Sequence, residues 1–262
     1  MKTYKTKTKD MKIDNLSVKI SESRISMGIQ AASEAAICLK QLLKEKDIAN
    51  IIFAAAPSQN EFLDALTQME DIDWKRVNAF HMDEYIGLGK DAPQGFGNFL
   101  QRHIFSKVPF RNVFFLNGQA ENIQEACQEY TSLLQNNPTD IVFMGIGENG
   151  HIAFNDPHVA DFQDPHLVKV VDLDEKCRQQ QVNDGCFTSI DKVPTHALTL
   201  TVPALYKADY LFCMVPGKTK AWAVNETLRG PVSPQCPASI LRNHPHATLY
   251  IDNDSSSIFM SK

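Results

Sequence analysis

Short apolar runs alternate with segments of helical periodicity along this chain, and the alternation restricts the folds open to it. Between residues 25 and 43, apolar side chains recur at steps of three and four, which predicts a long helix with one buried face. Strands that alternate with helices are typical of βαβ units around a mostly parallel sheet. The predicted strands lie at residues 16–20, 49–55, 77–82, 113–116, 140–144, 168–173, 197–201, 210–215 and 248–252.

The composition agrees with one domain that spans residues 1–262, because 43% of the residues are apolar and can form a single core. The net charge of −5 argues against a nucleic-acid partner, which needs a basic face. No apolar stretch approaches the ~20 residues that span a membrane. Six scattered cysteines without a C-x-x-C pair indicate free thiols in a reducing compartment, so we expect a cytoplasmic protein.

The richest candidate site is the segment 145–157, GIGENGHIAFNDP, which follows the strand predicted at residues 140–144. Catalytic groups in open α/β sheets lie at the carboxyl ends of such strands. A histidine titrates near neutral pH, so His151 is suited to acid–base catalysis. Asp156 is placed to orient its imidazole. Gly150 allows tight backbone geometry or the close approach of a ligand.

Three other interpretations of this segment are open. Its G-x-G-x-x-G spacing resembles a dinucleotide-binding fingerprint, but Pro157 soon ends the helix that this motif requires. A metal site formed by His151, Asp156 and His158 lacks a further ligand at a suitable spacing. A polar loop with a hydrogen-bonded histidine is the remaining alternative.

Polar residues also follow two other predicted strands. Asp83 and Glu84 come after the strand at residues 77–82, and we expect only one of them to face a pocket. A carboxylate there can move a proton between neighbouring carbons, whereas the alternative is a solvated turn. After the strand at residues 49–55, the spacing of Ser58 and Glu61 predicts a capping box. The helix amino terminus that it predicts is able to bind a phosphate.

The segment PGKTKA places lysines at a strand–turn–helix junction after residue 215. Lys218 or Lys220 can reach a phosphate there as a point charge. The string GKTK lacks the upstream glycine and the spacing of a Walker A motif, so nucleotide binding by that route is not expected.

Together, the segments HMDEYIGL, GIGENGHIAFNDP, VPTHALTL and VPGKTKA resemble the glucosamine-6-phosphate deaminase/isomerase family, in order and spacing, from about residue 51 to residue 250. The resemblance implies an α/β fold, a three-layer αβα sandwich with a Rossmann-like, mostly parallel sheet. It also implies a hydrolase/isomerase that opens the ring of an amino sugar phosphate, moves a proton from C2 to C1 and releases ammonia. No cofactor and no metal are implied, and a homo-oligomer is left open.

The matching motifs imply a role for each candidate residue. Asp83 matches the base that takes the C2 proton, and His151 matches the ring-opening acid/base. Asp156 stands where relatives usually have glutamate and would orient His151. Lys220 matches the phosphate-binding lysine, and Ser58 matches the threonine of the phosphate loop.

The chain departs from the family pattern at three places. Asn149 stands where aspartate is usual, so Asp156 is expected to take over the stabilisation of an imidazolium. The two glycines of the phosphate loop are replaced by Ala56 and Pro57. The arginine expected before Phe-Phe is absent from segment 183–187, and Arg178 is the substitute candidate.

From these residues we expect deamination of glucosamine 6-phosphate to fructose 6-phosphate. Galactosamine 6-phosphate is the alternative substrate, favoured by Asn149 and by the altered phosphate loop. A 6-phosphogluconolactonase is less expected, because residues 154–157 follow the deaminase pattern. A non-catalytic sugar-phosphate sensor would have no need of a base such as Asp83.

Overall fold

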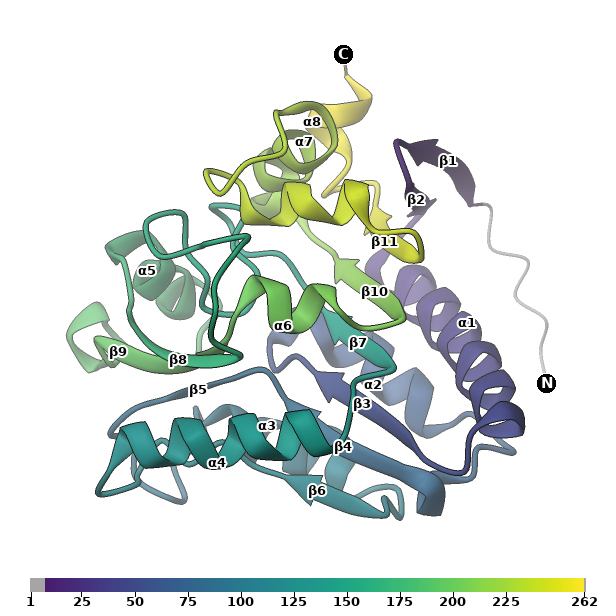
Figure 1. Cartoon of the computed structure of the whole chain (residues 1–262). Coiled ribbons are helices and arrows are strands. Elements are labelled where there is room, and N and C mark those ends of the chain that lie inside the picture. Colours follow the sequence, from purple (N-terminus) through teal and green to yellow (C-terminus); the bar gives the residue numbers. More distant parts are fainter. Residues whose placement is uncertain (1–7, 262) are drawn as a thin grey trace.

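Helices cover both faces of a mostly parallel sheet in this protein, whose computed structural model describes residues 8–261 (Figure 1). The strands are β1 (Lys9–Ile13), β2 (Leu16–Ser21), β3 (Ala49–Phe53), β4 (Val77–His81), β5 (Asp83–Tyr85), β6 (Asn112–Phe114), β7 (Ile141–Met144), β8 (Val168–Asp172), β9 (His196–Leu200), β10 (Tyr210–Val215) and β11 (Ala247–Asp252). The α-helices are α1 (Arg24–Glu45), α2 (Asn60–Thr67), α3 (Phe96–Leu100), α4 (Ile123–Asn136), α5 (Glu175–Asn183), α6 (Val202–Tyr206), α7 (Ala221–Arg229) and α8 (Ser257–Met260). Residues 1–7 of the basic amino-terminal segment and residue 262 lie outside the described part.

The main sheet has eight strands in the order β1-β2-β11-β10-β7-β3-β4-β6, and only β1 and β2 pair antiparallel. A small antiparallel sheet has the order β5-β9-β8. These findings confirm the predicted α/β sandwich. Strand β4 ends at His81 and β5 begins at Asp83, so the chain passes from the main sheet into the small sheet at this point.

The central strands are buried on both faces, as their continuous apolar runs predict. In β3, Ile51 and Phe53 belong to the core formed with α1 and α2, and Phe53 packs edge-on against Phe143 of β7. Ile52, which points the other way, belongs to a second core formed with α4 and α7. The sheet is therefore the middle of three layers, with a packed core on each of its faces.

Two strands were not predicted from the sequence. Strand β1 lies at the edge of the main sheet and carries the apolar residues Met11 and Ile13 among lysines and an aspartate. Charged residues of this kind protect an edge strand from pairing with other chains, and they also hide it from an apolar search. Strand β5 has three residues and pairs only within the small sheet.

The predicted capping box at Ser58 is wrong. Residues Pro57–Gln59 form a 3-10 turn, and α2 begins at Asn60 without a side-chain cap. A capping residue needs extended backbone angles, and Ala56 rather than Ser58 has them, with φ −161° and ψ 157°. Glu61 pairs instead with Arg24 of α1.

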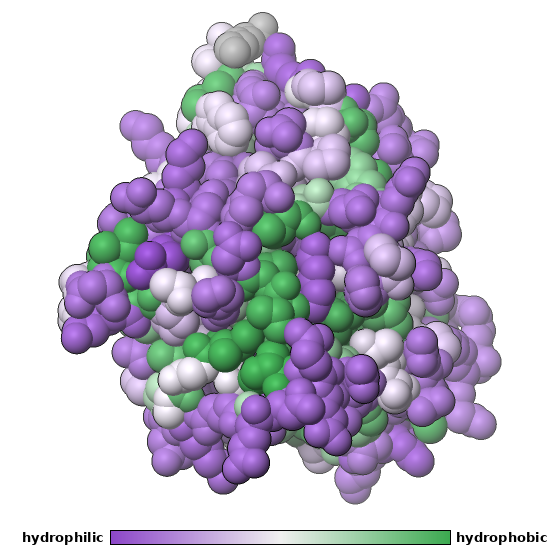
Figure 2. All heavy atoms as spheres, turned by 60° about the vertical axis from the view of Figure 1, so that its left-hand side comes forward, coloured by the Kyte–Doolittle hydropathy of each residue, from purple (hydrophilic) through white to green (hydrophobic). Residues whose placement is uncertain are grey.

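The surface is mainly hydrophilic, although a band of apolar side chains crosses the face shown in Figure 2. Within residues 8–261, no helix combines the length and the apolar character needed to cross a lipid bilayer. All six cysteines are free thiols, as predicted, and four of them are buried.

Candidate active site

A cavity of about 270 Å³ lies at the carboxyl ends of β3, β4, β7 and β10. Parallel strands present these ends at one edge of a sheet, so the segments that follow them meet there. Four of the predicted residues line the cavity: Ser58, Asp83, His151 and Lys220. They come from four separate segments of the sequence, and the topology brings them together.

Asp83 lines the cavity and is 7% exposed. Burial, and to a smaller extent the charge of Glu84, raises the pKa of Asp83 well above its ordinary value. Glu84 does not line this cavity, because its carboxylate accepts hydrogen bonds from the backbone N–H groups of Phe96 and Gly97 at 3.0 and 2.8 Å. As expected, one of the two adjacent carboxylates faces the cavity.

His81 holds the backbone of Asp83 in place, a role that the sequence did not reveal. Its Nε2 accepts a hydrogen bond from the Leu116 N–H at 2.9 Å. Its Nδ1 therefore carries the proton and donates to the Asp83 carbonyl oxygen, also at 2.9 Å. Burial lowers the pKa of His81 to about 4, so this ring stays neutral and serves as a fixed brace.

His151 and Asp156 lie in contact, as expected for the segment 145–157, with Nδ1 of His151 2.8 Å from Oδ1 of Asp156. Burial alone would raise the pKa of Asp156, but His151 and a hydrogen bond from Asn149 outweigh burial and lower it. The ionised carboxylate holds a proton on Nδ1. Nε2 is then the ring nitrogen left to exchange protons in the cavity.

Asn149 and Asp156 act through His151, because neither lines the cavity. The Nδ2 group of Asn149 donates to Oδ1 of Asp156 at 2.9 Å, and its Oδ1 accepts from the His151 backbone N–H at 3.1 Å. The same Nδ2 lies 3.5 Å from Oδ2 of Asp174. Asn149 is thus a positioning residue that places one neutral donor between two carboxylates.

Two glycines shape this loop in different ways. A Cβ atom on Gly147 would lie 2.2 Å from the His151 ring, so the imidazole rests directly on the backbone of Gly147. Gly150 adopts a φ of +87°, and a Cβ there would lie 2.7 Å from Sγ of Cys236. Gly150 does not line the cavity, so the predicted contact with substrate is corrected to a role in backbone geometry.

Thr199 of β9 connects the two catalytic segments. It pairs in register with Asp83 across the small sheet. Its Oγ1 also accepts a hydrogen bond from the Phe154 backbone N–H at 3.1 Å, and Phe154 lies three residues after His151. One buried residue therefore contacts both segments, through its backbone on the side of Asp83 and through its side chain on the side of His151.

Lys220 is 6% exposed and lines the cavity from the turn before α7. Burial lowers its pKa, although Asp184 and Glu148 act in the other direction. Among the residues that the structure describes, none forms an ion pair with Lys220. Ser58 also lines the cavity, with its Oγ accepting from Nε2 of Gln59 at 3.1 Å. A buried ammonium without a partner suits an anionic ligand.

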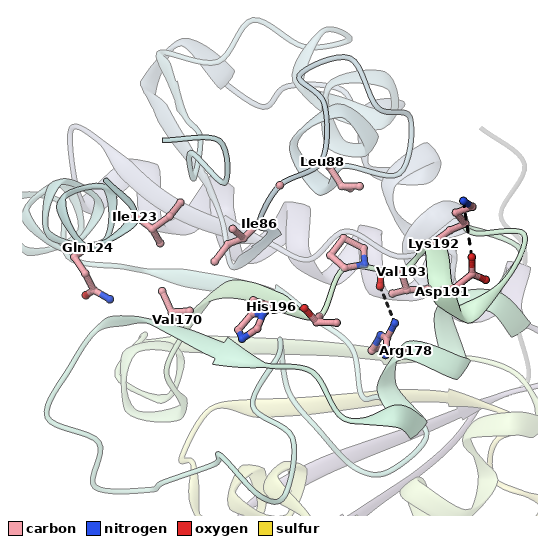
Figure 3. A pocket seen from close by; sticks show the side chains of 13 residues that line it. Ile86, Leu88, Ile123, Gln124, Val170, Arg178, Asp191, Lys192, Val193 and His196 are labelled. Atoms are coloured by element: carbon pink, nitrogen blue, oxygen red, sulfur yellow. Dashed lines mark hydrogen bonds and ion pairs between the residues drawn. The ribbon is translucent and has the colours of Figure 1, made fainter. Parts of the chain in front are cut away.

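Arg178 does not belong to this cavity, which corrects the sequence prediction. It lines a separate groove, in which Figure 3 shows its side chain turned toward Val193. Its Nη2 donates to the carbonyl oxygens of Ile190 and Val193 at 2.7 and 3.0 Å. Arg24, at the start of α1, lines the cavity instead. No motif surrounds Arg24, so the sequence alone gave no signal for it.

The metal-binding trio considered from the sequence is not assembled. His158 is exposed and pairs with Asp172 at 3.0 Å. In the described part of the chain, the groups with close donor atoms are His151, Asp156 and Cys177, and Asp156, His158 and Asp174. His151 and His158 therefore do not share a site.

Replacing Asn149 with aspartate would set a third carboxylate beside Asp156 and Asp174. Their repulsion would raise the pKa of the new group, so the fold is destabilised above that pKa and regains stability as the carboxyl is protonated. We expect a lower Tm than the wild type at pH 8 and a smaller difference near pH 4, with less than about tenfold loss of activity. Thermal unfolding of N149D between pH 4 and pH 8 measures this difference in Tm. The control is N183D, which adds a carboxylate at an exposed position. A deficit of equal size at every pH would contradict the charge argument.

The chain is similar to known proteins in its sequence and in its structure. A family sequence model described as glucosamine-6-phosphate isomerases/6-phosphogluconolactonase matches residues 22–250. A glucosamine-6-phosphate deaminase of Listeria innocua is 35% identical over 209 residues, which cover 80% of this chain and 87% of that relative. A deaminase of the same name from Bacillus cereus is 37% identical over 187 residues, covering 71% of this chain and 70% of that relative.

Solved structures agree with the family sequence model. A monomeric glucosamine-6-phosphate deaminase superposes with a TM-score of 0.83 at 30% identity, covering 95% of this chain and 100% of that chain. A 6-phosphogluconolactonase of Thermotoga maritima superposes with a TM-score of 0.72 at 21% identity, covering 90% of this chain and 98% of that chain. The second likeness shows a shared fold alone.

Proposed function

Because the chain belongs to the glucosamine-6-phosphate isomerase/6-phosphogluconolactonase family, we propose that it converts glucosamine 6-phosphate and water into fructose 6-phosphate and ammonia. One observation carries the proposal: a buried carboxylate, an oriented histidine and an unpaired buried lysine line the same cavity. The three groups, Asp83, His151 and Lys220, match the base, the ring-opening group and the phosphate anchor that this reaction requires.

Ring opening is the step for His151. With a proton held on Nδ1 by Asp156, its Nε2 takes the proton of the C1 hydroxyl and returns one to the ring oxygen. The C1–O5 bond breaks and the open-chain aldehyde forms. Asp156 stabilises the transient imidazolium, and Asn149 keeps Asp156 in position.

Proton transfer is the step for Asp83. Its carboxylate takes the proton from C2 of the open-chain sugar, and the electrons form a C1–C2 double bond with a hydroxyl on C1 and an amine on C2. The same carboxyl returns the proton to C1, which leaves an imine at C2. Water adds to the imine and ammonia leaves, so one water is consumed for each ammonia released. The raised pKa of Asp83 makes it a stronger base near neutral pH.

The test is an assay of purified protein with glucosamine 6-phosphate, galactosamine 6-phosphate and 6-phosphogluconolactone in parallel. We expect ammonia and fructose 6-phosphate in equal amounts from glucosamine 6-phosphate. Turnover of the galactosamine epimer alone would reassign the substrate, and lactone hydrolysis without ammonia would assign the other activity named in the family description. Tight binding of both amino sugar phosphates without turnover would support a sensor.

Replacing His151 with glutamine removes the ring-opening group while keeping a polar side chain. We expect a loss of about 10²-fold on the cyclic substrate. The loss should be much smaller on an open-chain analogue, such as an aldehyde derivative of glucosamine 6-phosphate without the hydroxyls that close the ring, because that analogue bypasses ring opening. Steady-state kinetics on both substrates measure the difference. Equal losses on the two would remove His151 from ring opening.

A further inference from the structure

Arg24 lines the same cavity as Ser58 and Lys220 but comes from the start of α1, far from every motif of the site. We propose that Arg24 binds the phosphate of the substrate and that Glu61 is the counter-ion which holds its guanidinium until the phosphate arrives. This inference rests on the proposed function, because it names the group that completes the phosphate end of the same site.

The guanidinium is held by a small set of contacts on one of its sides. Nε lies 2.6 Å from Oε1 of Glu61, and Nη2 lies 2.9 Å from Oε2 of the same carboxylate. Nη2 also donates to the carbonyl oxygen of Pro57 at 2.9 Å. Within residues 8–261, Nη1 makes no hydrogen bond, so its two N–H groups are available to a ligand.

The packing of α1 against α2 explains why Arg24 reaches this position. A Cβ atom on Gly28 would lie 2.7 Å from the backbone carbon of Glu61, so the two helices touch at Gly28 without an intervening side chain. Arg24 precedes Gly28 by four residues and shares its helix face. Its side chain is thereby placed over the start of α2 and the turn at Pro57. The close approach of two helices thus sets a cation beside the loop that carries Ser58.

The charges in the cavity favour a phosphate as the ligand of this arginine. Lys220 is buried and unpaired among the described residues, and a single ammonium neutralises only part of a phosphate dianion. The guanidinium of Arg24 can keep Nε and Nη2 on Glu61 and Pro57 and still offer the two N–H groups of Nη1 to a phosphate. Arg178, the other candidate, uses its Nη2 on two backbone carbonyls in a different groove.

Glu61 has a definite part in this arrangement. Its carboxylate occupies two of the donor groups of Arg24 in the free protein and reduces the net positive charge near Ser58. The Arg24 side chain is 44% exposed and the Glu61 side chain 24% exposed, so a phosphate can approach the pair from solvent. Binding of phosphate would share the guanidinium between two anions. Removing the charge of Glu61 should therefore strengthen phosphate binding. This effect should occur only when Arg24 is present.

Calorimetric titration of the full-length protein with fructose 6-phosphate, and with fructose as the unphosphorylated control, tests the proposal. We expect R24Q to weaken fructose 6-phosphate binding on the order of 10- to 100-fold and to leave fructose binding unchanged. R24K should lie between R24Q and the wild type. The matched control is R76Q, because Arg76 also donates to backbone carbonyls, those of Lys46 and Asp47, but lies outside the cavity.

The variant E61Q separates binding from a merely structural clamp. We expect E61Q to tighten fructose 6-phosphate binding severalfold when Arg24 is present, and to have no such effect in R24Q/E61Q. Wild-type affinity in R24Q, with a lowered Tm alone, would overturn the proposal and leave Arg24 as a clamp between α1 and the Pro57 turn. Phosphate binding that depends on Arg24 in a protein that releases no ammonia would overturn the proposed reaction and keep the phosphate site.

Discussion

Replacement of Asp83 by asparagine is expected to lower kcat by a factor on the order of 10²–10⁴, because a positioned general base contributes about that much to a proton transfer. Asparagine has the same shape but cannot accept the proton, so the affinity for substrate should stay within about threefold of the wild type. The sharpest measurement is the exchange of the C2 hydrogen with solvent deuterium, followed by NMR. Exchange at the wild-type rate in D83N would exclude Asp83 as the base.

The same variant should be more stable than the wild type at neutral and alkaline pH. Burial raises the pKa of Asp83 in the folded protein, so above that pKa a charged group is buried in the fold but hydrated in the unfolded chain. Below the unfolded pKa the group is neutral in both states and the penalty vanishes. The gain in Tm, roughly 2–4 °C per kcal/mol relieved, should therefore shrink as the pH falls toward 4. The neighbouring variant E84Q is not a suitable control for D83N, because the Glu84 carboxylate accepts hydrogen bonds from the first backbone N–H groups of α3.

Replacement of Lys220 by methionine is the second change with a large expected effect. Loss of a buried charge that pairs with the phosphate should lower kcat/KM for the phosphorylated substrate on the order of 10²–10³-fold. Methionine keeps the length of the side chain and needs no hydration, so the free protein should become more stable. Steady-state kinetics measure the first effect and thermal unfolding the second.

Two comparisons make the Lys220 result decisive. K75M is the control, because Lys75 is an exposed lysine outside the cavity lining, so its loss should stay below about tenfold. Inorganic phosphate should raise the Tm of the wild type by more than that of K220M, since a ligand stabilises the form that binds it more tightly. A K220M protein that keeps the full wild-type response to phosphate would place the anion elsewhere.

The fold and half of the candidate site could be predicted from the sequence, because both depend on where the buried strands lie and where they end. Buried strands are continuous apolar runs in the sequence, and the ends of parallel strands gather at one edge. Asp83, His151 and Lys220 follow such strands closely, so their meeting in one cavity needed no knowledge of side-chain packing. The edge strand β1 and the three-residue β5 were missed because neither has a long apolar run.

Residues that depend on packing between helices could not be predicted in this way. Arg24 reaches the cavity because α1 contacts α2 at Gly28, and a contact between residues 33 positions apart in the sequence leaves no local pattern. Arg178 was assigned to the site because of its place in the sequence, but α5 directs it toward Val193. Ser58 was expected to cap a helix, yet Pro57 starts a 3-10 turn one residue earlier.

Thr199 ties the segments of Asp83 and His151 together from a position outside the cavity lining. Its backbone pairs with Asp83 and its buried hydroxyl accepts a hydrogen bond from Phe154. A change at this one residue would therefore disturb the proposed base and the proposed ring-opening group at the same time, although it removes no group from the cavity.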